Sequence, residues 1–206
     1  MREVDGMGDT TQKRVRTWVM ASVAGLALIG GGYTSGVYIG PDPRFGEVMG
    51  SACRDLTQEA NAEDVDALAP AAEGYAVHES TMEKPGYYSG LCTVEAEGDQ
   101  ALYLSVEFTG YRSFEAWSEE VVDGFVPAAD RQRLDIAGGG WSTPTVTAVY
   151  VPCRMSDGAD TKRGGLSVRA KANNEGDHRA ELVAIAERAA EEAGSLSGPC
   201  DEPDAE

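Results

Sequence analysis

The sequence predicts an α+β domain preceded by one N-terminal transmembrane helix. Residues 18–39 carry no charged side chain, and all four cysteines lie after them. The rest of the chain alternates between the two-residue period of strands and the 3.6-residue period of helices. We therefore expect a compact antiparallel sheet with about three helices packed on it and two disulfides, as is common in exported domains.

We divide the chain into five parts. Residues 1–17 form a cytoplasmic N-terminus whose basic residues adjoin the apolar segment, as the positive-inside rule favours. Residues 18–40 form a transmembrane signal-anchor, and residues 41–50 form a linker that begins with two prolines. Residues 51–200 form the extracytoplasmic domain, and residues 201–206 form a disordered acidic tail.

The apolar segment has two interpretations. As a helix, residues 18–39 extend about 33 Å, enough to cross a bilayer core. Its most apolar part, residues 19–29, is as short as the core of a signal peptide, and a glycine cluster follows it. No A-x-A-like cleavage site follows the segment, and Cys53 lies too far away to be a lipoprotein cysteine. A single-pass anchor in the cell membrane is the expectation, with cleavage and secretion as the alternative.

The charge of the chain argues against nucleic acid as a partner. Residues 41–206 contain 32 of the 35 acidic residues and 13 of the 17 Lys and Arg residues, so 13 minus 32 gives a net charge of −19. Such a surface repels phosphate groups.

The first half of the domain predicts two helices and three strands. Residues 52–68 form a helix with an apolar face, and residues 75–81 form a strand. Residues 87–96 and 101–109 alternate clearly and form a hairpin, with Cys92 facing inward. Ser113 caps a helix over residues 114–122, whose Phe114 and Trp117 belong to the core.

The second half predicts a hairpin and a long helix after an irregular connection. Residues 125–144 show no steady period, so we expect a flexible connection, and three glycines precede Trp141. This loop is the best candidate for recognition. Residues 145–153 form a strand that ends or lies at an edge at Pro152, and residues 166–172 form its partner. Asp177 caps a helix that Gly194 ends.

The two halves share the order strand, cysteine, strand, helix, which predicts two β-β-α half-repeats. The four cysteines, Cys53, Cys92, Cys153 and Cys200, allow three pairings, and sequence does not choose among them. If each half closes its own bridge, the pairs are Cys53–Cys92 and Cys153–Cys200, and this is the pairing that we prefer.

We assign no catalytic residue, cofactor or metal. Zinc is not expected, because the cysteines form no close pair and the only histidines are His78 and His178. A Ca²⁺ site in residues 95–99 or 156–160 is an alternative, although neither segment has EF-hand spacing. Closely spaced acids, such as Asp64 with Asp66 and Glu95 with Glu97, are typical of surfaces.

The layout also resembles a known class of proteins. A cysteine at the head of a helix, the strand GLCTV, and an Ala-rich helix that ends in Gly-Pro-Cys are similar to exported, membrane-anchored or lipoprotein domains of actinobacteria. Such families are mostly of unknown function, so no functional residue is transferred. We expect a non-catalytic, membrane-tethered domain that binds a protein, a small ligand or the cell wall. The alternative is a secreted or surface-bound hydrolase whose carboxylates the sequence does not identify.

Overall fold

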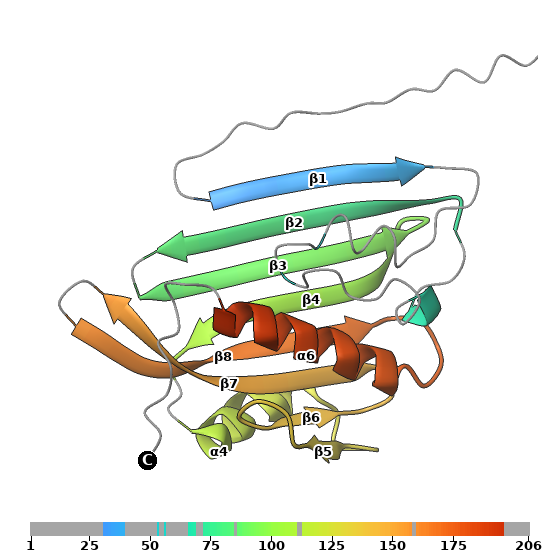
Figure 1. The fold of residues 1–206 in the computed structure, drawn as a ribbon. Coiled ribbons are helices and arrows are strands. Elements are labelled where there is room, and N and C mark those ends of the chain that lie inside the picture. The colour runs from blue at the N-terminus through green and yellow to red at the C-terminus, as the bar shows by residue number, and fades with distance from the viewer. Residues whose placement is uncertain are drawn as a thin grey trace, which may run out of the picture.

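A single antiparallel sheet organises the protein (Figure 1). The computed structural model describes residues 31–39, 53, 56, 66–68, 72–84, 86–110, 113–157 and 160–195. Eight strands lie in the order β1-β2-β3-β4-β8-β7-β6-β5. Their bounds are β1 Gly31–Ile39, β2 Gly74–Lys84, β3 Tyr87–Ala96, β4 Asp99–Thr109, β5 Gln132–Leu134, β6 Gly140–Ser142, β7 Val146–Asp157 and β8 Asp160–Ala172.

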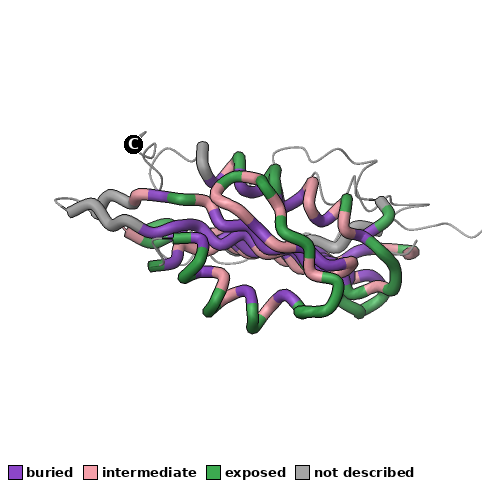
Figure 2. The backbone as a smooth tube through the Cα atoms, turned by 90° about the horizontal axis from the view of Figure 1, so that it is seen from below, coloured by how far each residue is buried: buried purple, intermediate pink, exposed green. Residues whose placement is uncertain are grey.

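Helical segments cover both faces of the sheet (Figure 2). The long helix α6 (Arg179–Ser195) packs on one face against β7, β8 and β4. On the other face, α4 (Phe114–Trp117), a π-helical turn η2 (Ser118–Val122) and α5 (Asp123–Phe125) follow one another without a break. A 3₁₀ turn, η1 (Asp66–Leu68), contacts α6.

The face under α6 carries the larger core, and the sequence predicted it well. The inward residues of the two central hairpins are apolar and buried, as the alternation requires. The α6 stripe is also buried: Leu182, Ile185, Ala186 and Ala189 have no exposed surface. Asp177 accepts a hydrogen bond from the backbone N–H of Arg179 at 3.1 Å, which confirms the predicted cap.

Both predicted hairpins are present. β3 has the predicted bounds, and β4 follows it through a turn in which Glu97 and Gly98 adopt positive φ of 54° and 90°. β7 and β8 pair from Val146↔Lys171 to Asp157↔Asp160. β7 does not end at Pro152, but β6 pairs with it only over Thr147–Val149, so the proline lies beyond the paired part of that edge.

The prediction of a helix is wrong for the last part of the apolar segment. Residues Gly31–Ile39 form strand β1, which pairs with β2 from Gly31↔Met82 to Ile39↔Gly74. Tyr33, Thr34, Val37 and Ile39 are residue types that favour strands, and β2 offers a free edge for pairing. Residues 1–30 and the predicted linker 41–50 lie outside the described part of the chain.

The first predicted disulfide is confirmed. Cys53 and Cys92 are bonded, with 5.8 Å between their Cα atoms, and neither is exposed. The bond holds the start of the predicted helix 52–68 over β3, where Leu56 packs against Gly90. Most of that helix, Cys200 and the acidic tail lie outside the described residues, so the pairing of Cys153 with Cys200 stays a prediction. None of the three described cysteines has a free thiol.

The helices contradict the predicted half-repeats. The hairpins β3–β4 and β7–β8 lie side by side through β4 and β8, in an arrangement that a two-fold axis normal to the sheet would produce. Such an axis keeps each face of the sheet on its own side, so both helices would share a face. Instead, α4 and α6 lie on opposite faces (Figure 2).

Candidate functional site

The face opposite α6 carries a cluster of aromatic and arginine side chains between α4–η2 and β5–β7. We call it the aromatic–arginine cluster; it consists of Phe114, Trp117, Arg131, Arg133, Trp141 and Tyr150. Ring centroids lie 5.6 Å apart in the pair Phe114–Trp117 and 5.8 Å apart in the pair Trp117–Tyr150. These separations are those of favourable aromatic pairs.

Local backbone features place the rings. The Ser113 hydroxyl accepts a hydrogen bond from the Ala116 N–H at 3.3 Å and begins α4, which carries Phe114 and Trp117. Gly139 has a φ of +116°, and a Cβ there would lie 2.8 Å from the Phe114 ring. A glycine is therefore needed both for the backbone and for the contact.

The segment predicted to be a flexible connection is instead ordered by this packing. Residues 132–134 and 140–142 form β5 and β6, and the Gly138 N–H donates to the Tyr150 carbonyl at 2.9 Å. A Cβ on Gly138 would lie 2.5 Å from Pro152. The consecutive glycines thus mark close packing on β7, which a single sequence does not distinguish from flexibility.

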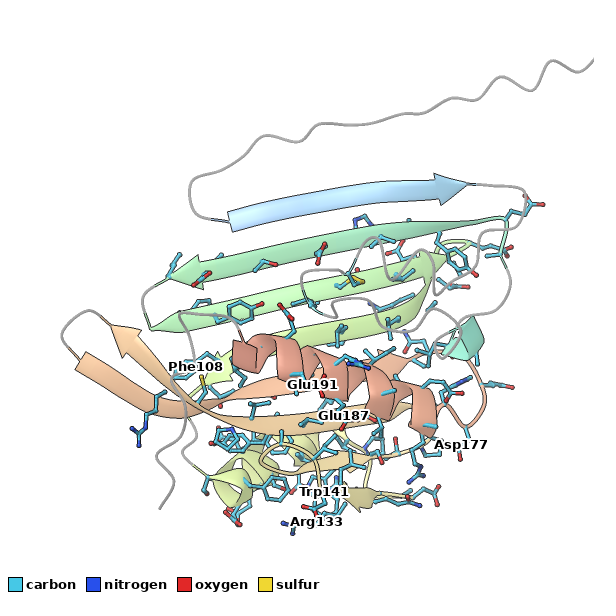
Figure 3. The ribbon with its side chains drawn as sticks, in the orientation of Figure 1. Phe108, Arg133, Trp141, Asp177, Glu187 and Glu191 are labelled. Atoms are coloured by element: carbon cyan, nitrogen blue, oxygen red, sulfur yellow. A yellow bond between two sulfur atoms is a disulfide. The ribbon has the colours of Figure 1, made fainter. Side chains whose placement is uncertain are left out.

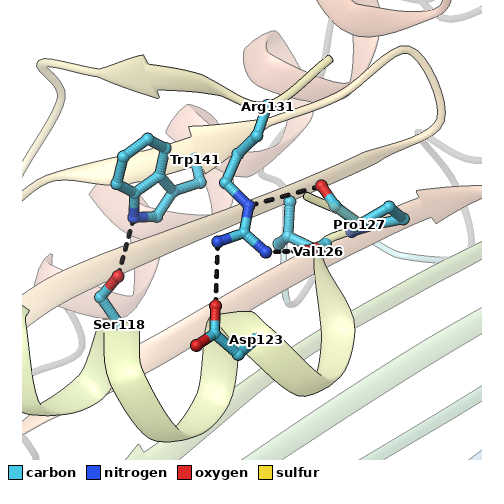
Figure 4. Close-up of polar contacts among 6 residues, drawn as sticks. All are labelled: Ser118, Asp123, Val126, Pro127, Arg131 and Trp141. Carbon is cyan, nitrogen blue, oxygen red and sulfur yellow. Dashed lines mark hydrogen bonds and ion pairs between the residues drawn. The ribbon is translucent and has the colours of Figure 1, made fainter. Parts of the chain in front are cut away.

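Trp141 lies at the boundary between this core and solvent. Its indole N–H donates to the Ser118 hydroxyl at 2.9 Å, and the Arg131 guanidinium lies 5.8 Å from the ring centroid (Figure 4). Arg131 also donates to Asp123 at 3.0 Å and to the carbonyls of Val126 and Pro127. Of the two described tryptophans, Trp117 is fully buried and Trp141 is partly exposed.

Arg133 is the most accessible cation of the cluster. It projects from β5 at the lower edge of the sheet in Figure 3, and its guanidinium lies 4.7 Å from the Phe114 centroid. Phe114 in turn stacks on Trp141 at 6.4 Å. In the part of the chain that the structure describes, Arg133 has no acidic partner, so the ring holds it without neutralising its charge.

The buried side of the cluster is satisfied internally. The Trp117 indole N–H donates to Ser167 at 3.0 Å, and the Tyr150 hydroxyl donates to the Gly164 carbonyl at 3.2 Å. Burial raises the pKa of Tyr150 above its usual 10.0, and the nearby negative charge of Glu115 raises it further. Tyr150 therefore stays neutral at ordinary pH and acts as a packing residue.

A second group of aromatic and charged side chains lies beside the cluster. The Phe125 ring packs 6.3 Å from Tyr103, and the Arg169 guanidinium lies 5.9 Å from it. Arg169 also donates to Ser167 at 3.1 Å and pairs with Glu107 at 3.6 Å. The face thus presents guanidinium groups on aromatic rings at two neighbouring places.

The structure does not bring His78 and Trp141 together. His78 lies on β2 and Trp141 on β6, five strand spacings apart, which is about 24 Å. His178 is buried at the start of α6, where its Nε2 lies 3.3 Å from the Glu175 carbonyl. Glu95 and Glu97 lie at the β3–β4 turn, whereas Asp64 is outside the described residues.

The described residues contain no group of three or more His, Cys, Asp or Glu side chains placed to hold a metal ion. No helix within them is long and apolar enough to cross a bilayer.

Three of the six cluster residues, Arg131, Arg133 and Trp141, lie in the connection 125–144 that the sequence offered as a candidate for recognition. The sequence predicted Phe114 and Trp117 as core residues only, and it did not single out Arg131, Arg133 or Tyr150. The available signal was the placement of two arginines close before an isolated tryptophan. Guanidinium groups over partly exposed rings can hold a partner through stacking and hydrogen bonds, but they supply neither a nucleophile nor a general base.

Comparison of the chain with protein families, with curated proteins and with solved structures found no match.

Proposed function

We propose that the chain is an exported, membrane-tethered domain that binds a protein partner through the aromatic–arginine cluster and catalyses no reaction. The observation that carries the proposal is the pair Trp141 and Arg133, which are cross-strand neighbours on β6 and β5. The pair brings together a partly exposed indole and an exposed guanidinium that has no acidic partner among the described residues. Tryptophan and arginine are the residues most enriched at the energetic centres of protein interfaces.

The charge of the chain makes the exposed Arg133 distinctive. The chain has a net charge of −18, so most of its surface repels acidic groups, whereas Arg133 can attract an acidic group of a protein partner. β5, which carries Arg133, is the last strand of the sheet in this direction. Its outer backbone groups add to the surface that a partner could contact.

The buried Cys53–Cys92 bond supports export, because structural disulfides persist in oxidising compartments. The tether is the apolar segment. Since β1 begins at Gly31, residues 18–30 remain for it, about 20 Å as a helix, which is shorter than a bilayer core. The basic residues at positions 13, 14 and 16 can reach the interface by extending their side chains, and the bilayer can thin locally.

Cleavage of the segment would affect the fold. A signal peptidase cuts within a few residues after the apolar core, and those residues are part of β1. We therefore expect the chain in the membrane fraction to retain the residues that precede β1. N-terminal sequencing of the mature protein tests this, and a chain in the medium that begins near residue 31 would contradict the tether.

Binding is tested by cross-linking in cells followed by affinity measurement. A photo-reactive residue at position 133 should capture a protein that the same residue at position 188, an exposed site on α6, does not capture. The captured protein should then bind the full chain, and Trp141→Ala should weaken binding at least tenfold, about 1.4 kcal/mol.

The matched control is Arg188→Ala, which removes an exposed arginine from the opposite face and should leave the affinity unchanged. Arg133→Glu provides a second variant that does not disturb the core. Equal affinity of the wild-type chain, W141A and R133E would rule out the cluster as the binding surface.

A further inference from the structure

The end of the sheet where β1 begins is joined directly to the apolar segment. Ile29 ends the most apolar part of this segment, residues 19–29, and β1 starts at Gly31. Two residues span at most about 7 Å, so wherever the apolar segment lies, this end of the sheet lies next to it. Gly31 is in register with Met82, so the β2–β3 hairpin is the neighbouring part of the sheet.

This hairpin carries the large apolar side chains that are exposed among the described residues. Met82 is 40% exposed and Tyr87 is 37% exposed, and these are the only exposed large hydrophobic residues among those described. Lys84 pairs with Tyr87, and Met82 is two residues from Lys84, so by alternation all three share one face of the hairpin. Tyr88, on the other face, is buried.

The combination of methionine, tyrosine and lysine fits a lipid surface. Tyrosine is enriched at the boundary between hydrocarbon and water, where its ring is apolar and its hydroxyl is hydrated. Lysine can bury its methylene groups there and keep its ammonium group in the headgroup layer. Methionine contributes apolar area without a polar group to satisfy.

The charges of the turns at the two ends of the sheet also favour the β2–β3 end as the one that faces the lipid. The β2–β3 and β7–β8 tips lie at one end (Figure 1), and residues 83–87 and 154–163 contain four bases and three acids. The β3–β4 turn lies at the opposite end, and residues 95–99 contain three acids and no base. A turn that approaches an anionic bilayer must avoid excess negative charge, and of the turns compared only the β2–β3 and β7–β8 tips do so.

We propose that the β2–β3 tip, with Met82, Lys84 and Tyr87, contacts the lipid surface and holds the strands upright on the membrane. This inference rests on the proposed tether. It places the β3–β4 turn about 33 Å away from the bilayer, the length of the ten-residue strand β3. The two edges of the sheet, including β5 with Arg133, then face sideways and stay accessible to a partner.

The test uses the full chain in vesicles of phosphatidylethanolamine and phosphatidylglycerol. The photo-reactive residue p-benzoylphenylalanine is placed at position 82, at position 87 or, as the matched control, at the exposed turn residue Glu97. After irradiation, lipid adducts are quantified by mass spectrometry. Adducts at positions 82 and 87 should exceed those at position 97 by about tenfold, because only the first two reach the interfacial layer.

The outcomes separate this inference from the proposed tether. If the chain pellets with the vesicles but yields equal adducts at all three positions, the orientation is wrong while the tether stands. If the chain does not pellet with the vesicles, the tether fails and this inference fails with it. Adducts confined to position 97 would mean that the sheet is inverted relative to the bilayer.

Discussion

At the scale of single residues, two glycines of β8 determine how Tyr150 packs. Tyr150 lies on β7 and points across β8, where its hydroxyl donates to the Gly164 carbonyl. A Cβ on Gly165 would overlap the Tyr150 ring, and a Cβ on Gly164 would lie 2.8 Å from the Phe108 ring. Small residues here leave room for aromatic rings on both faces of the same strand.

Replacing Gly165 by alanine should therefore destabilise the domain. The added methyl group overlaps the Tyr150 ring, which must shift and strain the hydrogen bond to Gly164. We expect the free energy of unfolding to fall by about 1–3 kcal/mol, as for other overpacked cores. Urea unfolding measures this. The matched control is Gly124→Ala in α5, where the new Cβ would meet no atom within 4 Å apart from its chain neighbours and its own helix backbone. Alanine should there leave stability unchanged or raise it.

Tyr150 also predicts how stability changes at alkaline pH. Because burial and Glu115 raise its pKa in the folded state, the folded chain holds this proton more tightly than the unfolded chain does. The resulting stabilisation is complete below pH 10.0, the unfolded value, and is lost as the pH rises toward the folded value.

Unfolding measured between about pH 9 and pH 11 should show this as a difference between variants. Tyr150→Phe removes the titrating group, so its stability should fall less steeply than that of the wild-type chain over this range. Glu115→Gln removes the added charge and should give an intermediate slope. Parallel curves for all three chains would show that Tyr150 titrates alike in both states.

At the scale of elements, the sequence predicted those in which one local period persists. β3, β4, β8 and α6 bury a regular set of apolar residues on one face, so alternation or helical spacing was sufficient. β5 and β6 have three residues each, too short to show a period, and they form because they pack on the aromatic–arginine cluster. β1 has the composition of a membrane segment as much as of a strand, and only its pairing with β2 distinguishes the two.

The Cys53–Cys92 bond makes a prediction at this scale, because it fixes an N-terminal segment to β3. It closes a loop with a sequence separation of 39 residues. In the chain-entropy model, such a loop stabilises the folded state by about 4 kcal/mol before any strain is subtracted.

The double variant Cys53→Ser/Cys92→Ser should lose about 2–4 kcal/mol of unfolding free energy, measured by urea titration without reductant. Adding reductant to the wild-type chain should lower its stability by at least this amount. If reductant changes the wild-type chain but the double variant is as stable as the oxidised protein, the stabilisation comes from a different bond.

At the scale of the whole molecule, composition limited the function more than it identified a site. The net charge of −18 and the wide spacing of the cysteines follow from the sequence alone, because they require no knowledge of contacts. The aromatic–arginine cluster does not follow from the sequence alone. Phe114 and Trp117 precede Trp141 by more than 20 residues, and Tyr150 lies on a further strand, so only the folded sheet brings the four rings together.

The net charge leads to a prediction for the entire domain. Exposed acids repel one another in the compact state, and salt screens this repulsion, since the Debye length falls from about 30 Å at 0.01 M to about 8 Å at 0.15 M. The melting temperature should therefore rise over this range of NaCl. If screening alone acts, the rise should depend on ionic strength and not on the identity of the cation. Matched solutions of NaCl, MgCl₂ and CaCl₂ at equal ionic strength should give equal melting temperatures.

A higher melting temperature in CaCl₂ alone would instead indicate a specific Ca²⁺ site. The acids of segments 95–99 and 156–160 would then be the first to replace with Asn and Gln.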